Sequence, residues 1–182
     1  IIGLPCGIGL FMLAEPIIAL LYPSIGQAKH ASSGALLEIM SIGVIFLTLV
    51  QAFTAILQSV NKQFHPVKNL ALGMVIKVFL SYVLIGIPDI NIKGAAISTT
   101  VAYLFVAIFN LYDINKTKIK ISLIKVSSRA LLSTAIMALT VWISFRFLLS
   151  AGISQRLATL GSIAGAVIVY AVCLFVTGTI TQ

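Results

Sequence analysis

The chain has 182 residues, of which 60% are hydrophobic and only 9% are charged, and its mean hydropathy is +1.14. Soluble globular domains carry about 25% charged residues, so this composition excludes the soluble class and indicates an integral membrane protein. The net charge of +8 does not indicate a nucleic-acid-binding protein, because the basic residues lie mainly between apolar segments and not on one face of a folded domain.

Six apolar segments follow one another along the chain, and we expect each of them to be a membrane-spanning helix. They cover residues 4–22, 34–60, 67–87, 94–111, 129–149 and 157–177. At a rise of about 1.5 Å per residue, about 20 apolar residues span a hydrocarbon core of roughly 30 Å. A helix also satisfies its own backbone hydrogen bonds in lipid. The sequence therefore predicts an all-α integral membrane protein with no extramembrane domain in its short loops.

The first segment contains Glu15 followed by Pro16, inside LFMLAEPIIALL. Proline removes a helix hydrogen bond and disfavours the helical conformation of the residue before it, so we expect a kink or break near Glu15. Interrupted helices in transporters often contact the ligand, but proline kinks are also common as packing features. Glu15 is therefore a candidate either for substrate binding or for packing.

The second segment carries small or polar residues at steps of three, four or seven, which place them on one helical face. They are Glu38, Ser41, Thr48, Gln51, Ala55 and Gln58. Such a face either lines a hydrophilic cavity or forms a seam where polar side chains bond to neighbouring helices. Gln51 is our candidate cavity residue on this face.

The third segment places Lys77 in the middle of an apolar helix, where an ammonium group costs about 2.5–3.5 kcal/mol on insertion scales. Asn69, Gly73 and Ser81 lie at spacing four along the same helix and share its face. A polar face is expected to point into the helix bundle or a water-filled cavity. Lys77 then contacts either an anionic group of a substrate or a structural partner, such as a carboxylate or a backbone carbonyl.

The last three segments show packing signals. The fourth opens with GAAISTT, whose small residues allow neighbouring helices to approach closely. The other two contain a thin hydroxyl stripe and a GxxxG pattern, which is typical of helix contacts. These residues are Ser133, Thr140 and Ser144 in the fifth segment, and Gly161 and Gly165 in the sixth.

Lysine and arginine residues set the expected orientation, because the cytoplasmic loops of membrane proteins are enriched in them. The loops after the second and fourth segments lie on one side and hold Lys62, Lys68, Lys116, Lys118, Lys120, Lys125 and Arg129. The opposite side holds Lys29, Lys93, Arg146 and Arg156. We therefore expect the KTKIK loop at 116–120 and the C-terminus in the cytoplasm. The KTKIK loop either only fixes this topology or also attracts anionic headgroups.

Catalytic and metal-binding patterns are absent from the sequence, which has no paired-carboxylate motif, GxSxG, HExxH or P-loop. His30 and His65 are expected in loops on opposite sides of the membrane. Cys6 and Cys173 lie far apart in apolar segments, without CxxC or Cys/His spacing. We therefore expect no enzyme activity, no cofactor and no metal.

Three stretches carry a family resemblance. They are AEPIIALLYP at 14–23, AFTAILQSVNKQFHPVKNLALGMVIKVFLSYVLI at 52–85 and IPDINIKGAAISTTVAYLFVAIFNL at 87–111. In this order they are similar to the C-terminal part of the polysaccharide-exporter branch of the multidrug/oligosaccharidyl-lipid/polysaccharide flippase superfamily, especially its stage V sporulation protein B group. The last two segments match by hydropathy more than by motif.

The resemblance implies a MATE-like flippase of about fourteen helices, in two lobes around a cavity, that works by alternating access. This chain would supply roughly the last six helices, and the missing N-terminal lobe would be its partner. The expected substrate is a lipid-linked oligosaccharide or undecaprenyl-pyrophosphate-type precursor, moved across the bacterial plasma membrane among membrane lipids for peptidoglycan and, in the sporulation group, for the spore cortex.

The resemblance also implies a substrate-binding role for Lys77, because a lysine in the middle of this helix is typical of the branch. Cavity cations in such a flippase would hold the pyrophosphate of the lipid carrier, and a lysine does so as a point charge. The predicted substrate-binding residues are Lys77, Asn69, Ser81, Gln51 and Glu15.

Two other functions stay open from the sequence. A multidrug or cation antiporter of the same superfamily would bind protons or sodium at intramembrane carboxylates, for which Glu15 and Glu38 are the candidates. A non-transporting membrane scaffold, or an enzyme subunit whose catalytic residues lie elsewhere, is the alternative from another class.

Overall fold

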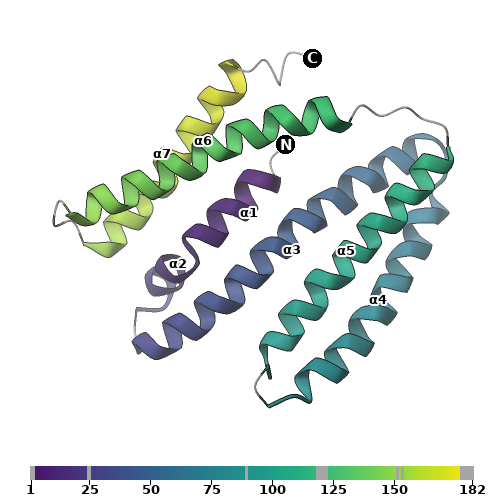
Figure 1. Ribbon diagram of the computed structural model, residues 1–182, viewed down its shortest axis with the longest axis horizontal. Helices are drawn as coiled ribbons and strands as arrows, with labels where there is room; N and C mark the ends of the chain where they lie inside the picture. Colours follow the sequence, from purple (N-terminus) through teal and green to yellow (C-terminus); the bar gives the residue numbers. More distant parts are fainter. Residues whose placement is uncertain are drawn as a thin grey trace. The chain divides into compact units, whose positions relative to one another are not determined.

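The computed structural model describes residues 3–23, 26–88, 90–117, 123–150, 152 and 154–176, and within these ranges it is helical, with no strand (Figure 1). The helices are α1 (Gly3–Met12), α2 (Ala14–Leu21), α3 (Gln27–Ser59), α4 (Phe64–Ile85), α5 (Lys93–Lys116), α6 (Leu123–Ser150) and α7 (Gln155–Val176). Five of them are long and apolar enough to cross a membrane, and the bent pair α1–α2 makes a sixth span if it is counted as one. The all-α membrane fold predicted from the sequence is therefore confirmed.

The chain divides into two compact units, each with its own core. Unit 1 comprises Ile1–Ser41 and Ser122–Gln182, and unit 2 comprises Ile42–Ile121. The core of unit 1 is formed by Leu13, Met137, Val141, Ala166 and Tyr170. The core of unit 2 is formed by Val50, Phe53, Leu57, Val106, Ala107 and Ile114, from α3 and α5.

The first predicted segment is broken in unit 1. Helices α1 and α2 meet at Leu13 with a bend of 75°. Pro16 has no N–H to donate to the carbonyl of Met12, four residues earlier, and its ring crowds that carbonyl. The first hydrogen bond of α2 instead runs from the Ile17 N–H to the Leu13 carbonyl, at 2.8 Å. The predicted break near Glu15 is therefore confirmed, and it lies at Leu13, two residues before Glu15.

Helices α4 and α5 form a close hairpin in unit 2. A Cβ atom added to Gly94 would lie 2.8 Å from the carbonyl carbon of Leu84, and one added to Gly73 would lie 2.2 Å from Cγ2 of Val106. Any larger residue would therefore force the two helices apart. This contact confirms that the GAA sequence at 94–96 is a packing surface.

Several boundaries differ from the prediction because helices continue beyond the hydrocarbon-length apolar runs. Helix α3 begins at Gln27 and not at residue 34, and α5 ends at Lys116 and not at residue 111. Polar residues continue the helical backbone hydrogen bonds at these ends. Hydropathy indicates which residues lie in the hydrocarbon core and does not indicate where the helix ends.

One glycine of the GxxxG pattern of α7 contacts α6, because a Cβ atom added to Gly161 would lie 3.3 Å from Cδ1 of Leu148. Ala158, Ser162 and Ala166 are buried, whereas Gly161 is exposed and a Cβ on Gly165 would meet no atom within 4 Å. The buried face of α7 therefore carries alanine and serine at spacing four, displaced by one position from the glycines.

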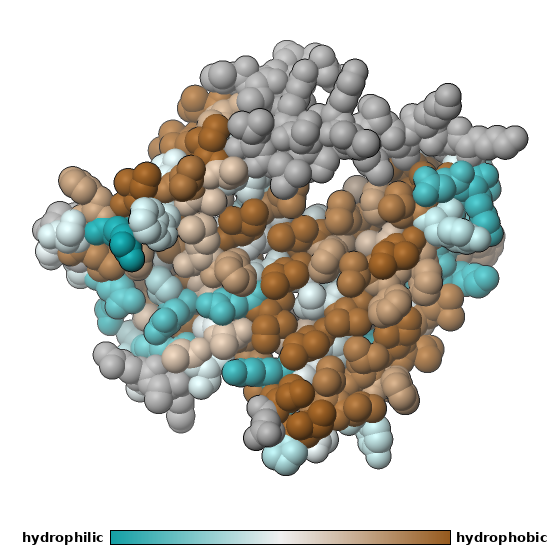
Figure 2. All heavy atoms as spheres, in the orientation of Figure 1, coloured by the Kyte–Doolittle hydropathy of each residue, from teal (hydrophilic) through white to brown (hydrophobic). Residues whose placement is uncertain are grey.

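Helix α4 turns a broad apolar surface outward from unit 2. Val75, Val78, Phe79 and Tyr82 are each more than 60% exposed. Figure 2 shows hydrophobic surface along the long helices, with hydrophilic residues gathered near the turns. Such a surface suits lipid or another apolar helix and is not a surface for water.

Candidate functional site

Lys77 lies in the middle of α4 and its side chain is exposed on unit 2. It is about 20 Å from the start of the helix and about 12 Å from its end at the standard helical rise. Among the residues that the structure describes, it forms no hydrogen bond or ion pair. The structural alternative for Lys77, a pairing with a carboxylate or a carbonyl, is therefore not seen in this part of the chain.

Asn69 occupies the same helical stripe but is buried against α5. Its Nδ2 donates to Asn110 Oδ1 at 2.9 Å and to Asp113 Oδ2 at 2.8 Å. Asn110 Nδ2 in turn donates to Thr54 Oγ1 of α3 at 3.4 Å. The structure thus places Asn69 in a network that joins three helices of unit 2.

Asp113 also lies 3.3 Å from Nδ1 of His65, at the start of α4. The predicted site residues do not include Asp113 or His65, although the spacing of polar residues along the two helices indicates this contact. His65 and Asn69 lie four residues apart on one helix, and Asn110 and Asp113 lie three apart on the next, so each pair shares a face. The two faces meet because the hairpin between the helices is antiparallel.

Ser81 is also engaged with α5. Its Oγ lies 2.6 Å from Oγ of Ser98, which is fully buried and donates its own hydroxyl to the carbonyl of Ala95 at 3.0 Å. Since the Ser98 hydroxyl hydrogen goes to Ala95, the Ser81 hydroxyl donates to Ser98. Ser81 and Asn69 therefore both contact α5, one on each side of Lys77 along the stripe.

Gln51 is exposed on α3 in unit 2. The hydroxyl groups on its predicted stripe bond within their own helix, Ser41 to the Glu38 carbonyl at 2.6 Å and Thr48 to the Ile45 carbonyl at 2.8 Å. These two bonds do not join α3 to a neighbour, so they do not support the seam interpretation. Gln51 as a cavity residue stays a prediction.

Glu15 lies in unit 1, in the first turn of α2, and its side chain is exposed. A Cβ atom on Gly34 of α3 would lie 3.2 Å from Cα and Cβ of Glu15, so the two helices touch at this residue. Glu15 lines a polar cleft of about 880 Å³, together with His30 and with Arg156 at the start of α7. Glu15 thus belongs to unit 1, and the other four predicted residues belong to unit 2.

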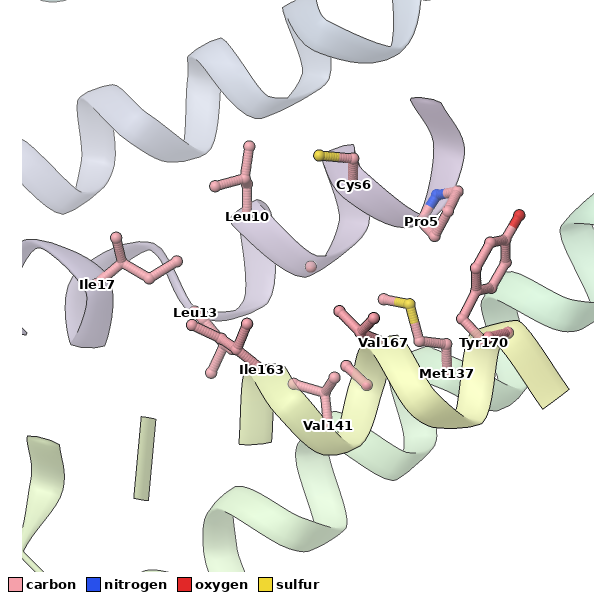
Figure 3. A pocket seen from close by; sticks show the side chains of 13 residues that line it. Pro5, Cys6, Leu10, Leu13, Ile17, Met137, Val141, Ile163, Val167 and Tyr170 are labelled. Carbon is pink, nitrogen blue, oxygen red and sulfur yellow. The ribbon is translucent and has the colours of Figure 1, made fainter. Parts of the chain in front are cut away.

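Unit 1 also contains an apolar pocket of about 460 Å³, which sequence analysis missed (Figure 3). Pro5 and Leu10 line it from α1, Met137 from α6, and Val167 and Tyr170 from α7. Its lining comes from four helices, α1, α2, α6 and α7. The sequence of each helix is that of an ordinary membrane-spanning segment and does not indicate a pocket. Leu13, at the bend between α1 and α2, and Ile17 of α2 also line the pocket.

Some predicted features lie outside the described side chains. These are the KTKIK loop beyond Thr117, Asp89, and the basic residues Lys29, Lys125 and Arg129. Their proposed roles in topology and headgroup attraction stay predictions. Among the described residues, no group of three or more histidine, cysteine, aspartate or glutamate side chains is placed to hold a metal ion.

Comparisons with known proteins place the chain among flippases. The family model described as "Lipid II flippase MurJ" matches residues 1–172. The "Uncharacterized membrane protein YabM" of Bacillus subtilis (strain 168) is 26% identical over 141 residues, which are 75% of this chain and 25% of that protein. The "Lipid II flippase MurJ" of the same organism is 32% identical over 103 residues, which are 56% of this chain and 18% of that protein.

The chain thus spans no more than about a quarter of the length of these curated relatives. The resemblance to the flippase superfamily is confirmed, while the narrower assignment to the stage V sporulation protein B group is not. Since the family model covers all but the last ten of the 182 residues, the chain belongs to the MurJ lipid II flippase family.

Proposed function

We propose that this chain forms helices of a flippase that moves a lipid-linked saccharide precursor of peptidoglycan, such as lipid II, across the bacterial plasma membrane. The observation that carries this proposal is the family match over residues 1–172. A role in spore cortex synthesis is a narrower prediction that rests only on the resemblance of the three quoted stretches.

Two features of the structure support a lipid-linked substrate. The apolar pocket of unit 1 is lined by apolar side chains together with the Cys6 thiol and the Tyr170 ring, so it suits part of an apolar chain. In unit 2, the Lys77 ammonium has no partner among the described residues and lies in the middle of a helix long and apolar enough to span a membrane. Charges at this depth mark substrate pathways more often than they face lipid, and a lysine attracts a phosphate as a point charge.

The antiporter alternative gains less support. Such a transporter would hold its ion at carboxylates within the spans. Glu15 and Glu38, its two candidates, are both exposed, and Asp113 is close to His65. No observation on the described residues favours proton or sodium binding over phosphate binding.

Translocation can be measured in cells whose resident lipid II flippase is depleted and which express the full protein that carries this chain. Radiolabelled precursor on the outer surface is released by an added, membrane-impermeant enzyme that cleaves its diphosphate. We expect expression to restore the releasable fraction of precursor. An unchanged fraction together with increased efflux of cationic drugs would contradict the proposal and support the antiporter.

We also propose that the α3–α4 turn faces the cytoplasm and the α6–α7 turn faces outward, as the distribution of lysine and arginine indicates. The test uses single cysteines at Gln63 and Ser154, both exposed, in a protein whose Cys6 and Cys173 are replaced by serine. A membrane-impermeant thiol reagent should label position 154 in intact cells and position 63 only after permeabilisation. The reverse pattern would invert the orientation.

A further inference from the structure

The polar cleft of unit 1 has the size and lining of a binding site that the proposed transport does not account for. It lies between α2, the start of α3 and the start of α7, and its volume is about 880 Å³. Ligand pockets fall in the range of about 300–1,000 Å³. The charged residues that line it are Glu15 and Arg156, and the imidazole of His30 joins them. Pro16 and Leu20 supply apolar wall.

Among the residues that the structure describes, the two opposite charges of the cleft are unpaired. Glu15 and Arg156 are both exposed, and neither forms an ion pair with a side chain in the described ranges. They line the same cleft without meeting, so the space between them admits another group. A ligand that carries both a cation and an anion would satisfy each of them, whereas a purely anionic ligand would be repelled by Glu15.

A hydrogen bond to the backbone determines which ring nitrogen of His30 carries a hydrogen at the side of the cleft. Its Nε2 lies 2.9 Å from the carbonyl oxygen of Tyr22, directly after α2. A carbonyl only accepts hydrogen bonds, so Nε2 carries the hydrogen. Nδ1 is then an acceptor in the neutral ring and a donor in the charged ring. His30 therefore adds a second donor for an anionic group only when it is protonated.

The helix ends beside the cleft are apolar on their outer surface. Leu21 is 63% exposed, Leu157 is 62% exposed and Leu160 is 52% exposed. Leu157 directly follows Arg156, and Leu20 of the cleft wall directly precedes Leu21. Charged groups that adjoin exposed leucines at helix ends match the boundary between lipid headgroups and acyl chains. The ligand is therefore expected to be amphipathic.

We propose that this cleft binds the headgroup of a zwitterionic phospholipid with a primary ammonium, of the phosphatidylethanolamine class. Arg156 binds the phosphate through its guanidinium, and Glu15 accepts hydrogen bonds from the ammonium. The acyl chains lie along the exposed leucines. This lipid is a resident of the bilayer and not the transported precursor, so the proposal does not depend on the transport activity.

The test is lipid retention by the full purified protein, measured by native mass spectrometry after incubation with equal amounts of phosphatidylethanolamine and phosphatidylglycerol. The two lipids share the phosphate, and only the first has the ammonium. We expect about a tenfold preference for phosphatidylethanolamine in the bound population, as one charge-assisted hydrogen bond would give. Phosphatidylcholine, whose ammonium has no hydrogen to donate, should be retained less than phosphatidylethanolamine.

Variants separate the two halves of the headgroup. Glu15→Gln should remove the preference for phosphatidylethanolamine while phosphatidylglycerol still binds, and Arg156→Gln should reduce the binding of both lipids. Arg156→Lys should keep part of the binding, because the positive charge remains. Glu38→Gln and Arg146→Gln are matched controls, since both residues are exposed in unit 1 and neither lines the cleft.

The proposal is overturned if the unmodified protein binds the two lipids equally or prefers phosphatidylglycerol. It is also overturned if Glu15→Gln keeps the preference, or if the control variants lose it to the same extent. The substituted side chains are exposed, so the variants are expected to fold, and size-exclusion chromatography checks this. If Glu15→Gln does not fold, Glu15→Ala replaces it, and a preference for phosphatidylethanolamine that Glu15→Ala keeps would overturn the proposal in the same way.

Discussion

Replacing Lys77 with glutamine is expected to lower translocation of the lipid-linked precursor at least about tenfold, which corresponds to roughly 1.4 kcal/mol of lost stabilisation. The amount of protein in the membrane should not fall. Lys77 is exposed and unpaired among the described residues, so its removal breaks no contact that holds unit 2 together. It also removes an ammonium that costs about 2.5–3.5 kcal/mol at the centre of a membrane helix.

Two further variants sharpen the experiment on Lys77. Lys77→Arg keeps the charge and should keep part of the activity, although the planar guanidinium differs from the compact ammonium. Lys68→Gln is the matched control, because Lys68 is exposed on the same helix but near its start. Precursor release at the outer surface and quantitative immunoblotting give activity per molecule. Full activity in Lys77→Gln would contradict the substrate role, and a loss of protein instead of activity would indicate a structural partner.

The fold was predictable because membrane helices depend on local features of the sequence. An apolar run of the right length must satisfy its own backbone hydrogen bonds in lipid, and this requirement needs no knowledge of distant residues. The break before Glu15 was predictable for the same reason, since the missing N–H of Pro16 acts within one turn. Helix ends were less predictable, because residues such as those at 27–33 continue the helix without being apolar.

The candidate site was predictable only in part, because helical spacing gives the face of a residue and not its partner. Asn69, Lys77 and Ser81 lie at multiples of four residues along α4, as predicted, but their side chains have different surroundings. Asn69 bonds to Asn110, and Ser81 bonds to Ser98, whereas the longer side chain of Lys77 is exposed. Which polar residue of α5 faces which residue of α4 depends on how the hairpin closes. That information lies in the close approach at Gly73 and Gly94, which sequence spacing alone does not convey.

The two cavities of unit 1 could not be predicted from the sequence for a related reason. The polar cleft is lined by both Glu15 and Arg156, which lie 141 positions apart in the chain (156 − 15). The apolar pocket joins Pro5 to Tyr170 in the same way. A sequence marks an unusual residue in an apolar run, but an apolar residue that lines a pocket looks the same as one that faces lipid. Only packing distinguishes the two.

Replacing Asn69 with leucine is expected to lower the stability of the full protein by about 1–3 kcal/mol, the cost of leaving buried polar groups unsatisfied. The amide of Asn69 donates to both Asn110 and Asp113, and Asn110 is fully buried. Leucine removes both donors and leaves Asn110 Oδ1 and the Asp113 carboxylate with fewer partners. A lower melting temperature in detergent, followed by intrinsic fluorescence, is the measurement.

Ser81→Ala provides the matched control for Asn69→Leu. It removes one interhelical hydroxyl contact to Ser98, and such hydrogen bonds between membrane helices contribute about 0.6 kcal/mol on average. We therefore expect a smaller decrease in melting temperature than for Asn69→Leu. A double-mutant cycle with Asp113→Asn isolates the coupling between Asn69 and Asp113, because the two residues share one hydrogen bond of 2.8 Å.

Activity per folded molecule then separates the structural role of Asn69 from its predicted substrate role. If Asn69 joins helices α4 and α5 only, the variant should have a lower melting temperature and translocate normally once the amount of folded protein is taken into account. A variant with an unchanged melting temperature and a loss of translocation like that of Lys77→Gln would contradict the structural role. The same helical stripe would then serve the substrate at both residues, and the hydrogen bonds to Asn110 and Asp113 would orient the amide for that contact.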